Sequence, residues 1–246
     1  MLTVILAIKN PNANQLLACL SSIAALKNNK LINLTIVSSG DIPAVVDFMK
    51  SFLDISIIES PPDGVYAAYN SGLEGNLSKY VMFMGADDLL LPGLDNTLNT
   101  LKSIKYNPDI IAAYSLMQDV GLSGPSKLYG SIIFRNWCQQ GLIYKSELFE
   151  DKRFDMKYIV QADHKFNIEL LSNAKTKLMY SNDVISHFSS GGLTSQRNDL
   201  LFREDLPKIV YGSYGFTFYL MCLLKRSLAD IIKGKPKEFS DSRVSK

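Results

Sequence analysis

The chain has 246 residues, of which 47% are hydrophobic and 20% charged, so it can form one large α/β domain or a domain with a tail. Its net charge of +2 gives no case for nucleic-acid binding, which usually shows clustered basic residues. Three widely spaced cysteines, Cys19, Cys138 and Cys222, form neither a disulfide framework nor a metal-binding pair, which favours a reducing cytoplasm. We expect the chain to begin with a strand and not a signal peptide, and no segment has the ~20 unbroken apolar residues of a membrane-spanning helix.

Apolar runs alternate with amphipathic stretches over the first hundred residues. Buried strands are expected at Leu2–Ile8, Leu34–Val37, Ile55–Ile58 and Tyr80–Met84. Apolar residues at helical spacing predict helices over 16–24, 45–53, 65–73 and 94–104. This alternation predicts a doubly wound, mostly parallel sheet with right-handed connections.

The alternation breaks after the strand expected at Ile110–Tyr114. Glycines and a proline between short apolar pieces in 116–135 predict a hairpin at the sheet edge. The remaining expected elements are a helical turn at Glu147–Phe149, a helix from Gln161, strands at Leu178–Tyr180 and Val184–His187, and a loop at 189–192 that a ligand could order.

The C-terminal segment differs in composition from the rest of the chain. Ile209–Leu224 is aromatic-rich and apolar but interrupted by Gly212 and Gly215, and residues 225–246 hold seven Lys/Arg against three Asp/Glu, a net charge of +4. We therefore predict a domain at 1–205 followed by an amphipathic helical tail at 206–246. The tail suits a helix on an anionic membrane surface, a helix docked on the domain, or a dimer contact.

Two adjacent carboxylates, Asp87 and Asp88, follow the strand at Tyr80–Met84. Open α/β sheets bind ligands at the carboxyl ends of their strands, so these side chains are placed where a ligand would lie. Because neighbouring carboxylates repel one another unless a cation lies between them, the pair suggests a divalent metal with a phosphate. The alternative is a turn with two solvated acids.

Several segments together resemble one known family, the inverting family-2 glycosyltransferases with the GT-A nucleotide-sugar-binding fold. The resemblance spans residues 3–197 and rests on the order of its pieces. These are Ile8-Lys9-Asn10, Pro62–Gly72 (similar to a D-x-G-I-Y-D-A-M-N-x-G segment), Phe83–Asp88, Gln140–Tyr144, Phe154–Tyr158 with Ala162-Asp163, and Phe188–Ser195. The sequence departs from the family pattern in having Ser38-Ser39 with a displaced Asp41, Gln139 in place of a common His, and Ala162 in place of a common Glu.

The resemblance implies roles for several polar residues in or next to these pieces. Asp88 would bind Mg²⁺ or Mn²⁺, Asp87 would face the ribose or the metal, and Asn10 would contact the donor. Asp63 would accept a hydrogen bond from a uracil N–H, or cap the helix that follows it. His187 would reach the metal or diphosphate, or serve as a structural hydrogen-bonding residue.

Asp163 is the candidate general base for an acceptor hydroxyl, and its alternative role is a helix N-cap. One base without a nucleophile implies single displacement with inversion at the anomeric carbon. Arg197 would pair with phosphate or remain solvated. Trp137 and Tyr144 would shape the acceptor pocket or pack in the core.

The resulting hypothesis is a metal-dependent transferase that moves a hexose or N-acetylhexosamine from a UDP-sugar to a lipid-linked glycan. It would act in bacterial surface-polysaccharide biosynthesis, at the cytosolic face of the inner membrane. A homo-oligomer is one assembly that we consider for it. The alternatives are an inactive nucleotide-sugar-binding protein of the same fold and a nucleotidyltransferase. A nucleotidyltransferase would be expected to show a Gly-rich basic phosphate loop near the first strand, and residues 8–12 contain none.

Overall fold

The computed structural model describes residues 1–61, 63–75, 77–189 and 199–233. Its strands are β1 (Leu2–Ile8), β2 (Ile32–Ser38), β3 (Asp54–Glu59), β4 (Tyr80–Gly85), β5 (Leu89–Leu90), β6 (Ile110–Met117), β7 (Gly121–Ser123), β8 (Leu142–Lys145) and β9 (Leu178–Phe188). Its α-helices are α1 (Ala13–Ala24), α2 (Val45–Met49), α3 (Val65–Gly72), α4 (Gly93–Ser103), α5 (Ala162–Ser172), α7 (Leu200–Tyr214) and α8 (Phe216–Lys233). Short 3₁₀ turns lie at Asn29–Leu31, Ser131–Ile133, Gln139–Gly141 and Ser146–Phe149.

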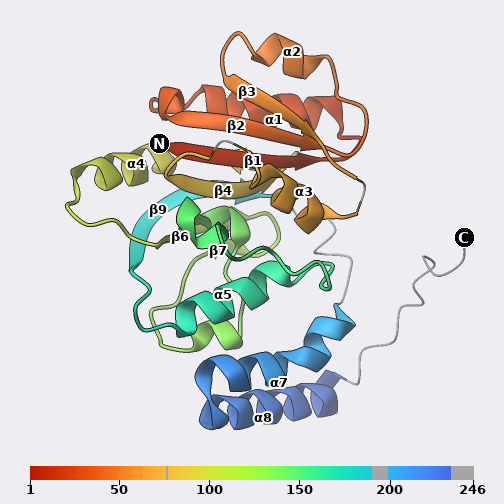
Figure 1. The fold of residues 1–246 in the computed structure, drawn as a ribbon, viewed down its shortest axis with the longest axis vertical. Coiled ribbons are helices and arrows are strands. Elements are labelled where there is room, and N and C mark those ends of the chain that lie inside the picture. Colours follow the sequence, from red (N-terminus) through yellow and green to blue (C-terminus); the bar gives the residue numbers. More distant parts are fainter. Residues whose placement is uncertain (62, 76, 190–198, 234–246) are drawn as a thin grey trace, which may run out of the picture.

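The strands form one mixed sheet in the order β3–β2–β1–β4–β8–β6–β9–β5, with β7 paired to β6 (Figure 1). β1 to β4 are parallel and lie side by side, as the β–α alternation predicted. β8 runs antiparallel between β4 and β6 and joins this parallel half to the second half of the sheet. The predicted α/β fold with a mostly parallel sheet is therefore confirmed.

Several element boundaries differ from the expected ones. The two strands expected at 178–180 and 184–187 are one strand, β9, whose pairing with β6 shifts register near Tyr114. The helix expected over 45–53 ends as α2 at Met49. The hairpin expected in 116–135 consists of β6 and β7, in which Met117 pairs with Gly121. β5 and β8 were not anticipated.

The core lies on both faces of the sheet because alternate side chains of each strand point to opposite sides. Leu2, Val4 and Leu6 of β1 belong to one buried cluster, which α1, α2 and α4 cover. Ile5 belongs to a second cluster with α3, α5 and the buried ring of Phe83. This second cluster supports the floor of the site described below.

α7 and α8 form a helical hairpin at the end of the molecule opposite β3 and α2 (Figure 1). Gly215, between the two helices, has a φ of 80°, a backbone conformation that favours glycine. The predicted boundary at residue 205 falls inside α7, and the division into 1–205 and 206–246 stays a prediction. None of the helices within the described ranges is both long and apolar enough to cross a bilayer.

Candidate active site

A cavity of about 370 Å³ lies where the carboxyl ends of β1, β2 and β4 meet. The loops that follow these strands contribute Asn10, Ser39, Asp87 and Asp88 to its lining. Asn10 has a φ of 45°, which Asn tolerates better than most residues, and its Oδ1 would lie 2.4 Å from a Cβ placed at Gly40. A side chain at position 40 would therefore displace the Asn10 side chain from this arrangement. Of the predicted site residues, this cavity gathers Asn10, Asp87 and Asp88.

Asp88 lies at the floor of this cavity and is 1% exposed. Its Oδ2 accepts hydrogen bonds from the Gly85 amide at 2.8 Å and from Gln140 Nε2 at 2.8 Å. Burial raises the pKa of Asp88 to about 7, and the charge of Asp87 adds to the rise while the two hydrogen bonds oppose it. A Cβ at Gly85 would lie 2.9 Å from Asp87 Oδ1, so a side chain at this position would push the Asp87 carboxylate away. The solvated-turn alternative therefore does not describe Asp88.

Two buried polar atoms near this turn have no hydrogen-bond partner among the described residues, Asp88 Oδ1 and His187 Nδ1. The β5–β9 pairing sets His187 opposite Leu89, the residue after Asp88. A carboxylate oxygen and a ring nitrogen that lack hydrogen-bond partners are suitable ligands for a divalent cation. However, His187 does not line the cavity, and no three His, Cys, Asp or Glu side chains within the described ranges converge as a preformed metal site.

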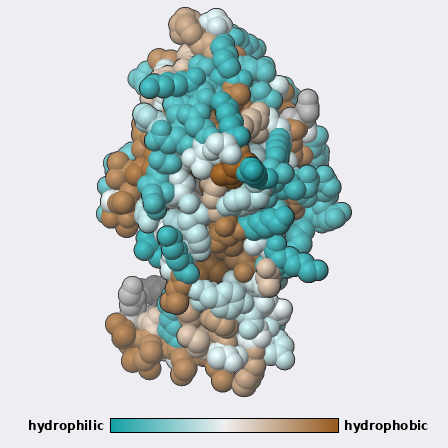
Figure 2. Space-filling model, turned by 90° about the vertical axis from the view of Figure 1, so that its left-hand side faces the viewer, coloured by the Kyte–Doolittle hydropathy of each residue, from teal (hydrophilic) through white to brown (hydrophobic). Residues whose placement is uncertain are grey.

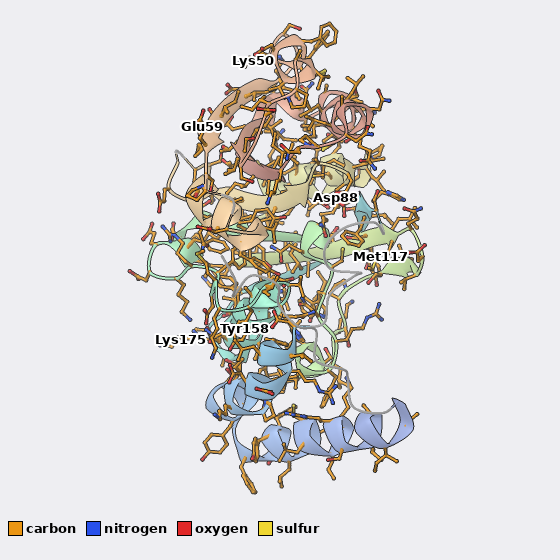
Figure 3. All side chains as sticks on the ribbon, turned by 90° about the vertical axis from the view of Figure 1, so that its right-hand side faces the viewer. Lys50, Glu59, Asp88, Met117, Tyr158 and Lys175 are labelled. Atoms are coloured by element: carbon orange, nitrogen blue, oxygen red, sulfur yellow. The ribbon has the colours of Figure 1, made fainter. Side chains whose placement is uncertain are left out.

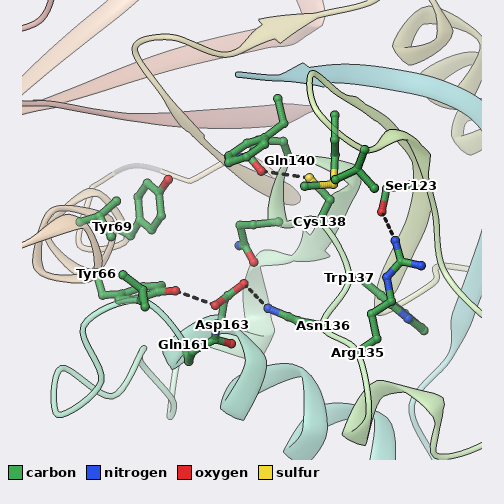
Figure 4. Close-up of a pocket in the computed structure, with 16 residues that line it drawn as sticks. Tyr66, Tyr69, Ser123, Arg135, Asn136, Trp137, Cys138, Gln140, Gln161 and Asp163 are labelled. Carbon is green, nitrogen blue, oxygen red and sulfur yellow. Dashed lines mark hydrogen bonds between the residues drawn. The ribbon is translucent and has the colours of Figure 1, made fainter. Parts of the chain in front are cut away.

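A second cavity of about 530 Å³ adjoins the first and contains Asp163 (Figure 4). Val65, Tyr69, Gln140 and Phe188 line both cavities. The second cavity is otherwise lined by apolar or aromatic side chains and by polar ones in similar numbers. Its apolar lining residues include Met117, Val120, Trp137 and Val160.

Asp163 is 6% exposed, and each of its carboxylate oxygens accepts one hydrogen bond. Tyr66 Oη donates to Oδ1 at 2.6 Å, and Asn136 Nδ2 donates to Oδ2 at 2.7 Å (Figure 4). Burial raises the pKa of Asp163, while these two bonds act in the opposite direction. Asp163 is not the N-cap of α5, which is Gln161, so the capping alternative is wrong.

Gln140 connects the two cavities. Its Nε2 donates to Asp88, and its Oε1 accepts a hydrogen bond from Cys138 Sγ at 3.2 Å (Figure 4). Gln140 and Tyr66 lie within segments that carry the family resemblance, but the sequence alone gave them no individual role. Asn136 lies outside every such segment, so only the fold places it beside Asp163.

The remaining predicted residues lie outside the two cavities or have structural contacts. Asp63 is exposed on the loop before α3, whose N-cap is Gly64, so the capping alternative for Asp63 is also wrong. Asp41 is exposed and lines neither cavity. Tyr144 is fully buried, with its hydroxyl 2.8 Å from Asn167 Oδ1, whereas Trp137 both packs in the core and lines the second cavity. Arg197 and the glycines at 191 and 192 lie outside the described residues.

The profile of the family described as "Glycosyl transferase family 2" matches residues 3–158. A curated relative, the "PGL/p-HBAD biosynthesis glycosyltransferase" of Mycobacterium tuberculosis, is 28% identical over 202 residues, covering 77% of this chain and 78% of the relative. "Glycosyltransferase GlyA" of Streptococcus pneumoniae is 30% identical over 182 residues, covering 63% of this chain but 26% of GlyA.

Solved structures show the same fold at low sequence identity. S. aureus TarS in complex with UDP-GlcNAc is similar with a TM-score of 0.73 and 14% identity, over 95% of this chain and 76% of TarS; the longer TarS chain is covered over 46% of its length. The mannosyltransferase PcManGT from Pyrobaculum calidifontis, in complex with GDP-Man and Mn²⁺, gives a TM-score of 0.59 at 15% identity, over 96% of this chain and 76% of PcManGT. The profile match, which covers more than half of the chain, and the shared fold lead to one assignment: the chain is a glycosyltransferase of family 2 with the GT-A fold.

Proposed function

We propose that this glycosyltransferase moves a hexose or N-acetylhexosamine from a UDP-sugar to a hydroxyl of a lipid-linked glycan, with inversion at the anomeric carbon. The observation that supports this most is the pair of adjoining cavities. One contains Asp87 and Asp88 at the carboxyl ends of parallel strands, and the other contains the buried carboxylate of Asp163. Donor and acceptor would meet where the cavities share Tyr69 and Gln140.

Asp163 would act as the general base on the acceptor hydroxyl. Its raised pKa makes it a stronger base than a solvated aspartate, and each carboxylate oxygen retains a lone pair beyond the one that Tyr66 or Asn136 occupies. The two donors fix the orientation of the carboxylate, as in-line attack on the anomeric carbon requires. No other described carboxylate lines the second cavity, and this favours single displacement.

A divalent cation, Mg²⁺ or Mn²⁺, is part of the proposal. Asp88 Oδ1 would bind it, with Asp87 and His187 as further ligands, and it would supply charge stabilisation for the departing diphosphate. The chain offers few preformed ligands here, so donor oxygens would complete the coordination.

The proposed identities of the donor and of the acceptor are supported by different observations. UDP is favoured because TarS, which shares the fold, is solved with UDP and UDP-GlcNAc. Asp63, exposed on the loop before α3 and outside both cavities, would contact the uracil N–H. Asn10 would contact the same donor from the loop after β1. A glycan acceptor, lipid-linked and presented at the cytosolic face of the membrane, follows from the family resemblance and the basic C-terminal segment. A homo-oligomer remains a further proposal.

The test is release of UDP from a panel of UDP-sugars with Mn²⁺ and a membrane extract as acceptor. Asp163→Asn and Asp88→Asn are each expected to lower turnover by at least ~100-fold, because one removes the base and the other a metal ligand. Asp151→Asn, at an exposed aspartate that lines neither cavity, should retain full activity. Full activity in both site variants would refute the assignment, and donor binding without turnover in the parent protein would favour the inactive binding protein.

A further inference from the structure

The outward side of α8 is apolar. Phe216 is 61% exposed, and six further large side chains on the same side are 43–79% exposed. They are Leu220, Met221, Leu224, Leu228, Ile231 and Ile232. We call these seven residues the outer face of α8. Their spacing of three, four and seven residues places them on one side of the helix.

The opposite side of α8 accounts for its packing on the rest of the protein. Phe218 packs against Tyr214 and Tyr129, Cys222 is buried, and Arg226 Nη1 donates to the backbone oxygen of Arg203. The helix therefore does not need its outer face for docking on α7. Figure 2 shows hydrophobic side chains gathered at the lower end of the molecule, and Figure 3 shows α8 along that edge with side chains that project away from the body.

An apolar face of this kind requires a partner. Monomeric soluble proteins rarely expose contiguous apolar patches of more than a few hundred Å², and larger ones mark sites of protein or membrane contact. Within the described residues, nothing covers the outer face of α8. A lipid surface or a second copy of the chain could cover this face.

Charge distinguishes a lipid surface from a second copy. Residues 225–246 carry seven Lys/Arg and three Asp/Glu, a net charge of +4. A second copy paired through the same faces would join two chains that each carry this net positive charge in their C-terminal sequence, which costs electrostatic energy. An anionic lipid surface attracts positive charge of this kind.

The position of the helical hairpin relative to the second cavity is also informative. Phe202 of α7 packs against His164, the residue after the proposed base, with ring centroids 5.1 Å apart. A smaller cavity lined by Phe202 and Leu206 shares Arg135, Asn136 and Gln161 with the acceptor-side cavity. α7, on which α8 packs, thus lies beside the cavity that would receive a lipid-linked acceptor.

We propose that the outer face of α8 inserts into the headgroup region of an anionic membrane, with α8 parallel to the surface. The apolar side chains would supply burial, and the net positive charge of the C-terminal sequence, +4 over residues 225–246, would supply attraction to anionic headgroups. This inference rests on the proposed lipid-linked acceptor for its biological purpose, but lipid binding can be measured without donor or acceptor.

The test is co-sedimentation of the full chain with two kinds of vesicle. One is phosphatidylcholine alone, and the other is phosphatidylcholine with about 30% phosphatidylglycerol. Binding is expected for the anionic vesicles and should weaken as salt is raised. The double variant Leu224→Gln/Ile231→Gln should bind roughly 30-fold more weakly, because two apolar side chains no longer insert. Both residues are exposed, so the variant is expected to fold, which circular dichroism checks.

A matched control is available at the other end of the molecule. Phe48 and Phe52 form an exposed aromatic pair near α2, and Phe48→Gln/Phe52→Gln should bind vesicles as the parent chain does. Absence of vesicle binding by the parent, or equal loss in both double variants, would overturn the proposal. So would a parent dimer that Leu224→Gln/Ile231→Gln converts to monomer, because the face would then be covered by a second copy. UDP-sugar turnover, measured separately, reports on the glycosyl transfer and not on lipid binding.

Discussion

At the scale of single residues, the environment of Asp163 combines two opposing requirements. A base must be basic enough to accept a proton, and burial provides this by raising the pKa of the carboxyl. The carboxylate must also persist in its charged form, and the donors on Tyr66 and Asn136 favour that form. These two side chains therefore regulate the pKa of the proposed base, and both line the cavity proposed for the acceptor.

Tyr66→Phe tests this regulation. Removal of the hydroxyl removes a bond that favours the charged form, so the pKa of Asp163 should rise further and the acidic limb of the kcat/KM profile should move to higher pH. At neutral pH we expect about a tenfold loss of kcat/KM. Tyr158→Phe is the matched control, because Tyr158 donates to Asp205 at 3.0 Å and lines neither cavity. A purely structural role for Tyr66 would lower activity without moving the limb.

His164 gives a second prediction at this scale, which concerns stability. Burial lowers its pKa from 6.5 to about 4, and its Nε2 lies 2.6 Å from the Ile132 carbonyl oxygen, to which the neutral ring donates. The unfolded chain therefore binds a proton below pH 6.5 that the folded chain does not. Stability should fall as pH drops from 6.5 to 4, by about 2 kcal/mol at pH 5 and about 3 kcal/mol in full.

The measurement is urea unfolding of the parent and of His164→Gln between pH 7.5 and 4. Glutamine retains a donor for the Ile132 carbonyl but does not titrate. The difference in unfolding free energy between the two proteins should shrink as pH falls. A difference that stays constant with pH would show that His164 is not held neutral in the folded chain.

The sequence indicated the carboxylates of the site but not the residues that hold them. Asp87 and Asp88 follow an apolar strand, and that local pattern was enough to place them at the sheet edge. Tyr66 and Asn136 are 97 and 27 residues from Asp163 in the chain, and no local pattern links them to it. Their contacts depend on how α3 and the turn at Ser131–Ile133 pack on the second half of the sheet.

At the scale of elements, the junction of α4 with β9 depends on a glycine. A Cβ at Gly93 would lie 2.3 Å from the Val184 carbonyl oxygen, which is closer than real contacts allow. The close approach to β9 was not anticipated, because β9 lies ninety residues later and was expected as two strands.

Gly93→Ala should therefore force α4 away from β9 and destabilise the protein by about 1–3 kcal/mol. Gly212→Ala is the control, because Gly212 lies within α7 and a Cβ there meets nothing within 4 Å. That variant should be more stable by about 0.5–1 kcal/mol, since alanine loses less backbone entropy in a helix. Chemical denaturation of both variants checks the opposite signs, and equal effects would contradict this account of Gly93.

Elements differed in how well the sequence predicted them, for a physical reason. β1, α1 and β4 were placed correctly, because a long buried run or a regular apolar spacing can be recognised within the sequence of the element itself. β5 has two residues, and β8 was read only as part of a family segment. Both exist because a neighbouring strand is available to pair with them, and such pairing leaves little trace in a short stretch of sequence.

At the scale of the whole molecule, two cavities lie at the sheet and have different proposed roles. The first would bind the donor and the metal, and the second would bind the acceptor and contains the proposed base. Gln140 reaches Asp88 from the turn that precedes β8, the strand that joins the two halves of the sheet. Donor binding should therefore depend on the first cavity and be nearly independent of the base in the second.

Thermal unfolding with UDP and Mn²⁺ tests this division. A ligand at a hundredfold excess over its Kd stabilises the folded state by about 2.7 kcal/mol, which for a chain of this size raises Tm by about 5–10 °C. Asp88→Asn should lose most of the rise that depends on Mn²⁺, because it removes the proposed ligand. Asp163→Asn should keep the full rise although its turnover is abolished. If Asp163→Asn lost the rise as well, the two cavities would form a single binding site, and the assignment of Asp163 to the acceptor side would be wrong.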